Sequence, residues 1–258
     1  MACWARLFPC DCLMHVLITR PEPDAAALRA QLEALGHQVT SEPLLTIKHL
    51  PIAADALGDA AGLVVTSRNG VRALAASPAL QAAQQLPIVA VGPGTAALAR
   101  QLGFARINEG GGTATELVPL IADTARTLLG TLVHVRGEQV AVDLKTALRA
   151  QGVDLREIVA YRAVPATALR PGTRELLASG GIDAVILMSP RTGAIFARLI
   201  AVAGLREAAQ KLVLLCLSPA VAASVEPLAP VRVEVADGPN SAGLLTTVTR
   251  VATLWSGV

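Results

Sequence analysis

The feature that most constrains the fold of this chain is a regular alternation of short apolar runs with amphipathic segments. In segments such as 24–35, 95–102 and 143–150, apolar residues recur three and four positions apart, as on one face of a helix. This alternation predicts parallel sheets with helices on both faces. The expected strands are 15–20, 38–42, 63–66, 88–91, 106–108, 132–135, 155–161, 184–188, 212–217 and 231–235.

The chain also resembles itself. Four blocks recur in the same cyclic order, which indicates a duplicated domain. The paired blocks are VLITRPEPDAAALRAQLEALGHQV from Val16 with VHVRGEQVAVDLKTALRAQGVDL from Val133, GLVVTSRNGVRAL from Gly62 with DAVILMSPRTGAIF from Asp183, PIVAVGPGTAALARQL from Pro87 with KLVLLCLSPAVAASV from Lys211, and GGGTATELVPLI from Gly110 with DGPNSAGLLTTV from Asp237.

Composition excludes several classes of protein. Hydrophobic residues make up 53% of the chain but aromatic residues only 2%, so the core must be aliphatic. The longest uncharged stretch, 73–99, contains three glutamines and three prolines, and we do not expect it to span a membrane. The net charge is +2 and there is no run of basic residues, which argues against a nucleic-acid binder. Only three of the 22 basic residues are lysines; this arginine bias fits carboxylate or phosphate binding, and equally a GC-rich genome.

The first residues, MACWARLFPCDCLMH, lack a basic region followed by a long apolar one, so no secretory signal is expected. We interpret them as a poorly ordered extension that carries Cys3, Cys10 and Cys12, whereas Cys216 lies in an apolar run. Free cysteines in a cytoplasmic protein are the expectation. A metal site is the weaker alternative, because no histidine pair completes the spacing.

Ligands of open parallel sheets bind beyond the carboxyl ends of the strands. The repeat presents three such turns twice, each where a strand meets a helix whose free N–H groups favour an anion. Capping explains any single turn equally well, but the set favours anion recognition. The turns are Thr19-Arg20-Pro21 with Arg136-Gly137-Glu138, Thr66-Ser67-Arg68-Asn69-Gly70 with Ser189-Pro190-Arg191-Thr192-Gly193, and Gly92-Pro93-Gly94-Thr95 with Ser218-Pro219-Ala220.

The sequence contains few other candidates for catalytic residues. No Walker loop, GxGxxG fingerprint, GxSxG, HExxH or CxxC motif is present. The four histidines, His15, His37, His49 and His134, fall in or beside strands and are interpreted as core or surface residues. Tyr161, the only tyrosine, has two interpretations: an aromatic residue packed at a hinge, or a phenol that donates a proton in the site.

With these blocks in view, the chain resembles the uroporphyrinogen-III synthase family from about residue 14 to residue 250. The motifs that carry the resemblance are the early TRP at Thr19, TSRNGV at Thr66, VGPGTA at Val91, RG at Arg136, VAYR around Tyr161 and SP at Ser189.

The resemblance implies a lyase that closes hydroxymethylbilane to uroporphyrinogen III, with inversion of ring D and loss of water. No metal or organic cofactor is implied. Loss of the ring A hydroxyl gives an azafulvene-like cation, which ring D attacks through its substituted carbon. The substrate carries eight carboxylates, which turns rich in N–H, hydroxyl and arginine groups would hold. A cytoplasmic monomer is expected, with possible hand-over of substrate from hydroxymethylbilane synthase.

For the site, we expect Tyr161 as the catalytic residue and the turns as the binding residues. In this family the turn at Ser218 often carries Gly and Thr, so the serine there is a departure. The expected binding residues are Thr19, Arg20, Thr66, Ser67, Arg68, Asn69, Gly92, Gly94, Thr95, Arg136, Gly137, Ser189, Arg191 and Ser218.

The family also implies a particular division of the chain. A plain duplication would cut it once, near residue 130. The family instead joins 1–46 to 164–258 and makes 47–163 the second domain, with linkers near 42–51 and 160–165 and a cleft between the domains. The alternative function is a non-catalytic two-domain protein that binds an anionic metabolite. A two-domain glycosyltransferase is disfavoured because the domains are too short.

Overall fold

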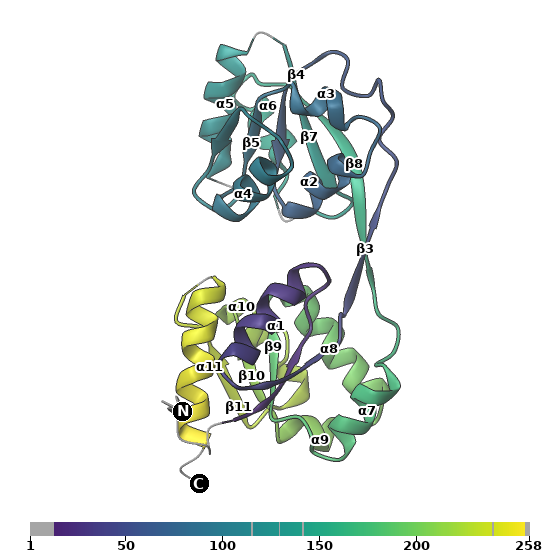
Figure 1. Ribbon diagram of the computed structural model, residues 1–258, viewed down its shortest axis with the longest axis vertical. Helices are drawn as coiled ribbons and strands as arrows, with labels where there is room; N and C mark the ends of the chain where they lie inside the picture. The colour runs from purple at the N-terminus through teal and green to yellow at the C-terminus, as the bar shows by residue number, and fades with distance from the viewer. Residues whose placement is uncertain (1–12, 115, 129, 141, 239, 256–258) are drawn as a thin grey trace, which may run out of the picture. The chain divides into compact units, whose positions relative to one another are not determined.

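The computed structural model describes residues 13–114, 116–128, 130–140, 142–238 and 240–255. The expected N-terminal extension, with Cys3, Cys10 and Cys12, lies outside the described residues. The chain divides into two compact units (Figure 1). The first unit takes the chain up to Thr46 and again from Pro165, and the second unit comprises Ile47–Val164.

The first unit is built on a five-stranded sheet in the order β11-β10-β9-β1-β2, in which all neighbours run parallel. Its strands are β1 His15–Ile18, β2 Gln38–Ser41, β9 Ala184–Leu187, β10 Val213–Cys216 and β11 Arg232–Val235. Its helices are α1 Asp24–Ala34, α7 Pro171–Ala178, α8 Pro190–Val202, α9 Arg206–Gln210, α10 Pro219–Ala223 and α11 Ser241–Trp255, with a 3-10 turn at Glu226–Leu228.

The second unit has the strand order β8-β7-β4-β5-β6, also parallel, and β3 is added beside β8. The strands are β3 Leu45–His49, β4 Ala60–Val65, β5 Ile88–Ala90, β6 Ile107–Glu109, β7 Thr131–Gly137 and β8 Leu155–Pro165. The helices are α2 Arg68–Ala75, α3 Leu80–Gln84, α4 Pro93–Gln101, α5 Leu117–Thr127 and α6 Leu144–Arg149. All ten predicted strands are present, and the predicted class of parallel sheets flanked by helices is confirmed.

The two sheets have the same spatial order once the repeated blocks are matched. Strands β2-β1-β9-β10-β11 of the first unit correspond to β8-β7-β4-β5-β6 of the second. Of the matched strands, β1 comes first along the chain in the first unit, whereas β4, the equivalent of β9, comes first in the second unit. One unit is therefore a circular permutation of the other. In the first sheet the chain leaves the adjacent strands β1 and β9 toward opposite edges of the sheet, and in the second sheet it leaves β7 and β4 in the same way. Ligands of doubly wound sheets bind beside such a strand pair.

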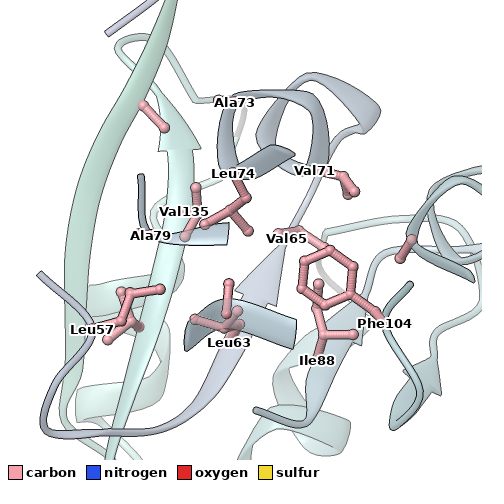
Figure 2. Close-up of a cluster of buried hydrophobic side chains, with 14 of the residues drawn as sticks. Leu57, Leu63, Val65, Val71, Ala73, Leu74, Ala79, Ile88, Phe104 and Val135 are labelled. Atoms are coloured by element: carbon pink, nitrogen blue, oxygen red, sulfur yellow. The ribbon is translucent and has the colours of Figure 1, made fainter. Parts of the chain in front are cut away.

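Side chains of successive strand residues point to opposite faces of the sheets, and each face is covered by helices. In the second unit Leu63 and Val65 pack with α2, α3 and α4, and Figure 2 shows Phe104 beside Val65 and Ile88. Val64 and Leu132, on the other face, pack with α5 and α6. In the first unit α1 and α11 share one face, and α8 lies against β9. The core is aliphatic, as the composition predicts.

Two chain segments connect the units, and each is tied to its neighbours by backbone hydrogen bonds. Leu50 donates its N–H to the carbonyl of Ala160 at 2.8 Å, and Ala166 donates to Leu44 at 3.0 Å. The buried Glu42 carboxylate accepts hydrogen bonds from the Arg170 N–H and the Thr173 hydroxyl at the start of α7. Glu42 therefore anchors both segments on the side of the first unit. Among the described residues no helix has the length and apolarity needed to cross a membrane.

Candidate functional site

In the second unit, the turns that follow β4, β5 and β7 meet at one edge of the sheet. Val65 pairs with Ala90 on one side and with Val135 on the other. Residues just beyond these positions therefore lie next to one another, at the carboxyl ends of parallel strands. This register brings together the predicted site residues Thr66, Ser67, Gly92, Arg136 and Gly137.

Tyr161 reaches this edge from β8. It pairs with Gly137 of β7 after a register shift, and Glu138 donates its N–H to the Tyr161 carbonyl at 2.9 Å. A Cβ atom on Gly137 would lie 2.8 Å from the tyrosine ring, closer than real Cβ contacts come. The glycine thus makes the space that the ring occupies. The Tyr161 hydroxyl oxygen lies 2.8 Å from the Ser67 hydroxyl oxygen.

Ser67 is fixed by its place at the start of α2. Its backbone is extended, and its hydroxyl oxygen accepts hydrogen bonds from the N–H groups of Asn69 at 3.1 Å and Gly70 at 3.4 Å. This is an ordinary N-cap interaction. Gly70 lets α2 approach β7, because a Cβ atom there would lie 2.8 Å from the Val135 carbonyl oxygen. The cap and the close packing together fix Ser67, and with it the Tyr161 hydroxyl.

On the opposite face of the same edge, Thr66 contacts a buried histidine. The Thr66 hydroxyl oxygen lies 3.2 Å from Nε2 of His134, whose side chain is 1% exposed. The other ring nitrogen, Nδ1, lies 3.6 Å from Oε1 of Glu157 on β8, and Nε of Arg136 lies 3.1 Å from that oxygen. Burial lowers the pKa of His134 to about 4; Glu157 acts against this shift and Arg136 acts with it. The imidazole is therefore neutral near pH 7.

The predicted turn at Gly92 precedes α4. A Cβ atom on Gly92 would lie 2.9 Å from the Cα of Gly112, so the turn packs closely against the loop after β6. Thr95 is buried and donates its N–H to the Gly92 carbonyl, whereas a Cβ atom on Gly94 would meet nothing within 4 Å. The open side of this turn is therefore at Gly94.

Three other predicted residues of the second unit have defined partners. Asn69 accepts a hydrogen bond from Arg72 at 3.0 Å. Arg136 donates to the carbonyls of Gly137 at 2.8 Å and Glu138 at 3.1 Å, in addition to its contact with Glu157. Arg68, the first residue of α2, is partly buried and also has interactions within the protein.

The first unit brings its predicted turns together in the same way. Ile18 of β1 pairs with Ile186 of β9, and Leu187 pairs with Cys216 of β10. Ser189 and Ser218, two residues beyond these strands, cap α8 and α10 respectively. Ser189 forms a capping box with Thr192. Both serines thus lie where free N–H groups of helix starts face the sheet edge.

The remaining predicted site residues of the first unit also form contacts within that unit. Thr19 is buried, and its hydroxyl donates to the Ile186 carbonyl at 2.7 Å across the β1/β9 pair. Arg20 lies 3.4 Å from the Asp24 carboxylate and 3.5 Å from the Met188 sulfur. Arg191, the second residue of α8, is partly buried and has interactions within the protein.

The sequence indicated His134 only as a core or surface residue and gave no role to Glu157, although both contact the site. The sequence signal for these two residues lies in the alternation of side chains along the strands and not in any motif. His134 stands two residues after Leu132, and Glu157 stands two residues after Leu155, so each polar side chain lies on the sheet face to which a buried leucine also points. The sequence predicts both strands but neither their order nor their register, so the pairing of these two residues is visible only in the structure.

The chain is similar to a known protein family and to solved structures. The family model described as uroporphyrinogen-III synthase HemD matches residues 26–246. The crystal structure of uroporphyrinogen-III synthetase from Helicobacter pylori superposes with a TM-score of 0.64 at 16% identity, over 92% of this chain and 99% of that one. A mutant uroporphyrinogen III synthase from Thermus thermophilus gives a TM-score of 0.56 at 18% identity, over 93% and 99% of the two chains. The search of curated proteins gives no match.

The structural matches establish the fold, and the family model covers every strand of the two sheets except β1. They give no support to the alternative of a binding protein without catalysis. The chain belongs to the uroporphyrinogen-III synthase family.

Proposed function

We propose that this chain closes hydroxymethylbilane to uroporphyrinogen III at the strand ends described above, with Tyr161 as the proton donor. The observation that carries the proposal is the 2.8 Å contact between the Tyr161 and Ser67 hydroxyl oxygens at the carboxyl edge of the second sheet. The reaction is a lyase reaction, because water is lost as the ring closes.

The direction of that hydrogen bond supports a donor role for the tyrosine. A hydroxyl oxygen has two lone pairs and one proton. The Ser67 oxygen accepts from the N–H groups of Asn69 and Gly70, so its own proton is the group left to donate to Tyr161. The phenol proton is then free to point away from Ser67 and toward a substrate. Tyr161 in this arrangement is a neutral acid whose oxygen is held in place.

Binding of the substrate carboxylates falls to the turns. Ser189 and Ser218 mark helix starts in the first unit, and Gly92 and Ser67 mark helix starts in the second. Helix starts supply N–H donors and a favourable dipole for anions. We propose that Arg20, Arg68, Arg136 and Arg191 add positive charge around these turns and that Thr19, Asn69, Gly94, Thr95 and Gly137 complete them. Thr66 is proposed to contact the substrate at a group other than a carboxylate.

The proton balance of the reaction fits one acid. Tyr161 gives its proton to the ring A hydroxyl, the C–O bond breaks, and water leaves as the pyrrole nitrogen donates its electron pair. Ring D attacks the resulting cation through its substituted carbon. The bond from that carbon to the methylene group of ring C then breaks, and the methylene cation so formed is attacked by the unsubstituted α-carbon of ring D. The proton on that α-carbon is released as ring D regains its aromaticity, and this proton restores the phenol. The enzyme's further task is to hold the chain so that this route outruns simple closure.

The test is incubation of the purified protein with hydroxymethylbilane, followed by separation of the type I and type III isomers. Spontaneous closure gives type I, so an excess of type III over a protein-free control is the expected result. A mixture identical to that control, from protein shown to be folded, would overturn the proposal.

We further propose that the protein works as a cytoplasmic monomer that receives its substrate from hydroxymethylbilane synthase. Free hydroxymethylbilane closes spontaneously to the type I isomer. Direct transfer between the two enzymes would shorten the time in which this closure can occur. Mixing the two proteins should raise the type III fraction at a fixed synthase activity when the concentration of this chain is increased.

A further inference from the structure

We infer that His134 is a positioning residue that orients the Thr66 hydroxyl as a hydrogen-bond acceptor for a substrate N–H group, with Glu157 fixing the imidazole tautomer. The inference deepens the proposed function and rests on it, since Thr66 is one of the residues proposed to contact the substrate.

The first step concerns the surroundings of the imidazole. His134 lies on β7 between its neighbours β4 and β8, and it pairs with Val64 on one side and Glu157 on the other. The charged groups that face it are Glu157 from β8 and Arg136 from its own strand. The Glu157 oxygen that approaches Nδ1 is the same oxygen that lies 3.1 Å from the Arg136 guanidinium.

The second step is the tautomer. At 3.6 Å the separation of Nδ1 from the Glu157 oxygen exceeds a hydrogen bond, but a lone pair on Nδ1 would still face a carboxylate. A proton on Nδ1 replaces that repulsion by attraction. The single proton of the neutral ring is then on Nδ1, which leaves Nε2 as an acceptor.

The third step concerns the Thr66 hydroxyl, because the tautomer of His134 determines where its proton points. With Nε2 as acceptor, the hydrogen bond of 3.2 Å must be donated by the Thr66 hydroxyl. The threonine proton is then directed inward, and the lone pairs of its oxygen are what Thr66 presents to a ligand. Carboxylates repel such an oxygen, whereas the pyrrole N–H groups of a linear tetrapyrrole are the donors that fit it. Thr66 is thereby assigned to a pyrrole ring rather than to a side-chain carboxylate.

The chain offers a matched pair as a control. His15 and Thr40 make the same contact in the first unit, with Nε2 2.8 Å from the threonine oxygen. His15 is the first residue of β1, at the end of the strand opposite to Thr19. Substitutions of this pair remove the same chemistry from a place outside the proposed site.

The kinetic test is a double-mutant cycle with Thr66→Val and His134→Leu. Each single change should lower kcat/KM about three- to tenfold, the effect of one neutral hydrogen bond, and the double variant should be no worse than Thr66→Val. His134→Gln, whose amide can accept from Thr66, should restore kcat/KM to within about twofold of wild type. His15→Leu and Thr40→Val should leave kcat/KM unchanged. Additive losses, or an equal loss in His134→Gln, would overturn the inference.

A second measurement does not depend on turnover. In protein labelled with ¹⁵N-histidine, the His134 shifts should report a proton on Nδ1 and none on Nε2 at pH 7, and Glu157→Gln should weaken this preference. A proton on Nε2 in the wild-type protein would overturn the inference whatever the activity. A protein with the expected tautomer that makes no type III isomer would instead overturn the proposed function.

Discussion

The hydroxyl oxygens of Tyr161 and Ser67 lie 2.8 Å apart, although 94 positions separate the two residues in the chain. The contact joins a residue within β8 to the N-cap residue of α2. Because the Ser67 oxygen accepts from two backbone N–H groups, the proposed function takes Tyr161 as the partner whose proton is available for chemistry.

Tyr161→Phe should therefore lower kcat while leaving product affinity nearly unchanged. The phenyl ring keeps its packing over Gly137, and only the donor is removed. Assistance by a general acid contributes about 10²–10⁴-fold, and a loss in that range is expected. Steady-state kinetics and a product-binding titration measure the two effects. The type III fraction of the remaining enzymatic product should stay high. Turnover close to wild type would leave Tyr161 with a packing role alone.

Gly137→Ala should damage activity more than stability. The new methyl group would lie 2.8 Å from the Tyr161 ring, which must then move away from Ser67. A displacement of about 1 Å can cost up to about 100-fold, so we expect kcat to fall between about tenfold and 100-fold. Gly172→Ala is the control, because a Cβ atom there meets nothing within 4 Å and alanine favours the helix α7. Equal kinetics of the two variants would contradict the prediction.

No single arginine of the set Arg20, Arg68, Arg136 and Arg191 should be indispensable. A hydrogen bond to a charged group contributes about 1.5–3 kcal/mol, so each change to alanine should cost at most about 100-fold in kcat/KM. Arg136→Ala should also lower stability, since this side chain holds two carbonyls and Glu157. Kinetics with urea unfolding as a parallel measurement separate the two effects. Complete loss of turnover in a folded variant that still binds product would identify a catalytic arginine.

Glu42→Ala should destabilise the first unit by about 1.5–3 kcal/mol. The carboxylate is 1% exposed and holds the Arg170 N–H and the Thr173 hydroxyl, which the variant leaves without this partner. Urea unfolding followed by circular dichroism is the measurement. The control is Glu33→Ala on the exposed side of α1, which should change the free energy of unfolding by less than about 0.5 kcal/mol. An equal effect of both changes would show that Glu42 is not an anchor.

His134 should make the protein less stable in mild acid. Its pKa is about 4 in the folded protein and near the ordinary value of 6.5 in the unfolded chain, so the unfolded state binds more protons between these values. The free energy of unfolding should fall as pH drops from 6.5 to 4, by roughly 3 kcal/mol, and show no contribution from this residue above pH 6.5. His134→Leu removes the contribution. The difference in stability between variant and wild type should therefore change with pH, and a constant difference would contradict the assignment.

Much of the fold followed from periodicity and repetition. The matched blocks require equivalent strands, and the sheet orders agree with that equivalence through a circular permutation. Strand positions were predictable because Val-, Ile- and Leu-rich runs such as 63–66 and 184–188 are buried on both faces. Strand β3 was expected only as an extended linker. Its partner β8 lies more than 100 positions away, and local sequence carries no signal for that pairing.

The site was predictable as a set of turns but not as a set of contacts. Parallel register determines that Thr66 and Arg136 end neighbouring strands. It does not determine that the Thr19 hydroxyl donates to Ile186, or that Thr66 contacts His134. Such choices depend on which side chains converge on one face of the sheet after long-range pairing. For the same reason the sequence assigns no site role to His134 or Glu157, since neither belongs to a motif.

The insertion of the second unit into the chain of the first also affects the order in which the protein can fold. Strand β1 pairs with β9, and His15 donates its N–H to Asp183, 168 positions later. Closing so long a loop carries an entropic cost that grows with the logarithm of its length. Once the second unit has folded, Leu50 and Ala160 are hydrogen-bonded, and the residues between them no longer lengthen the loop. Early folding of the second unit therefore lowers the closure cost of the β1/β9 pair by about 1 kcal/mol.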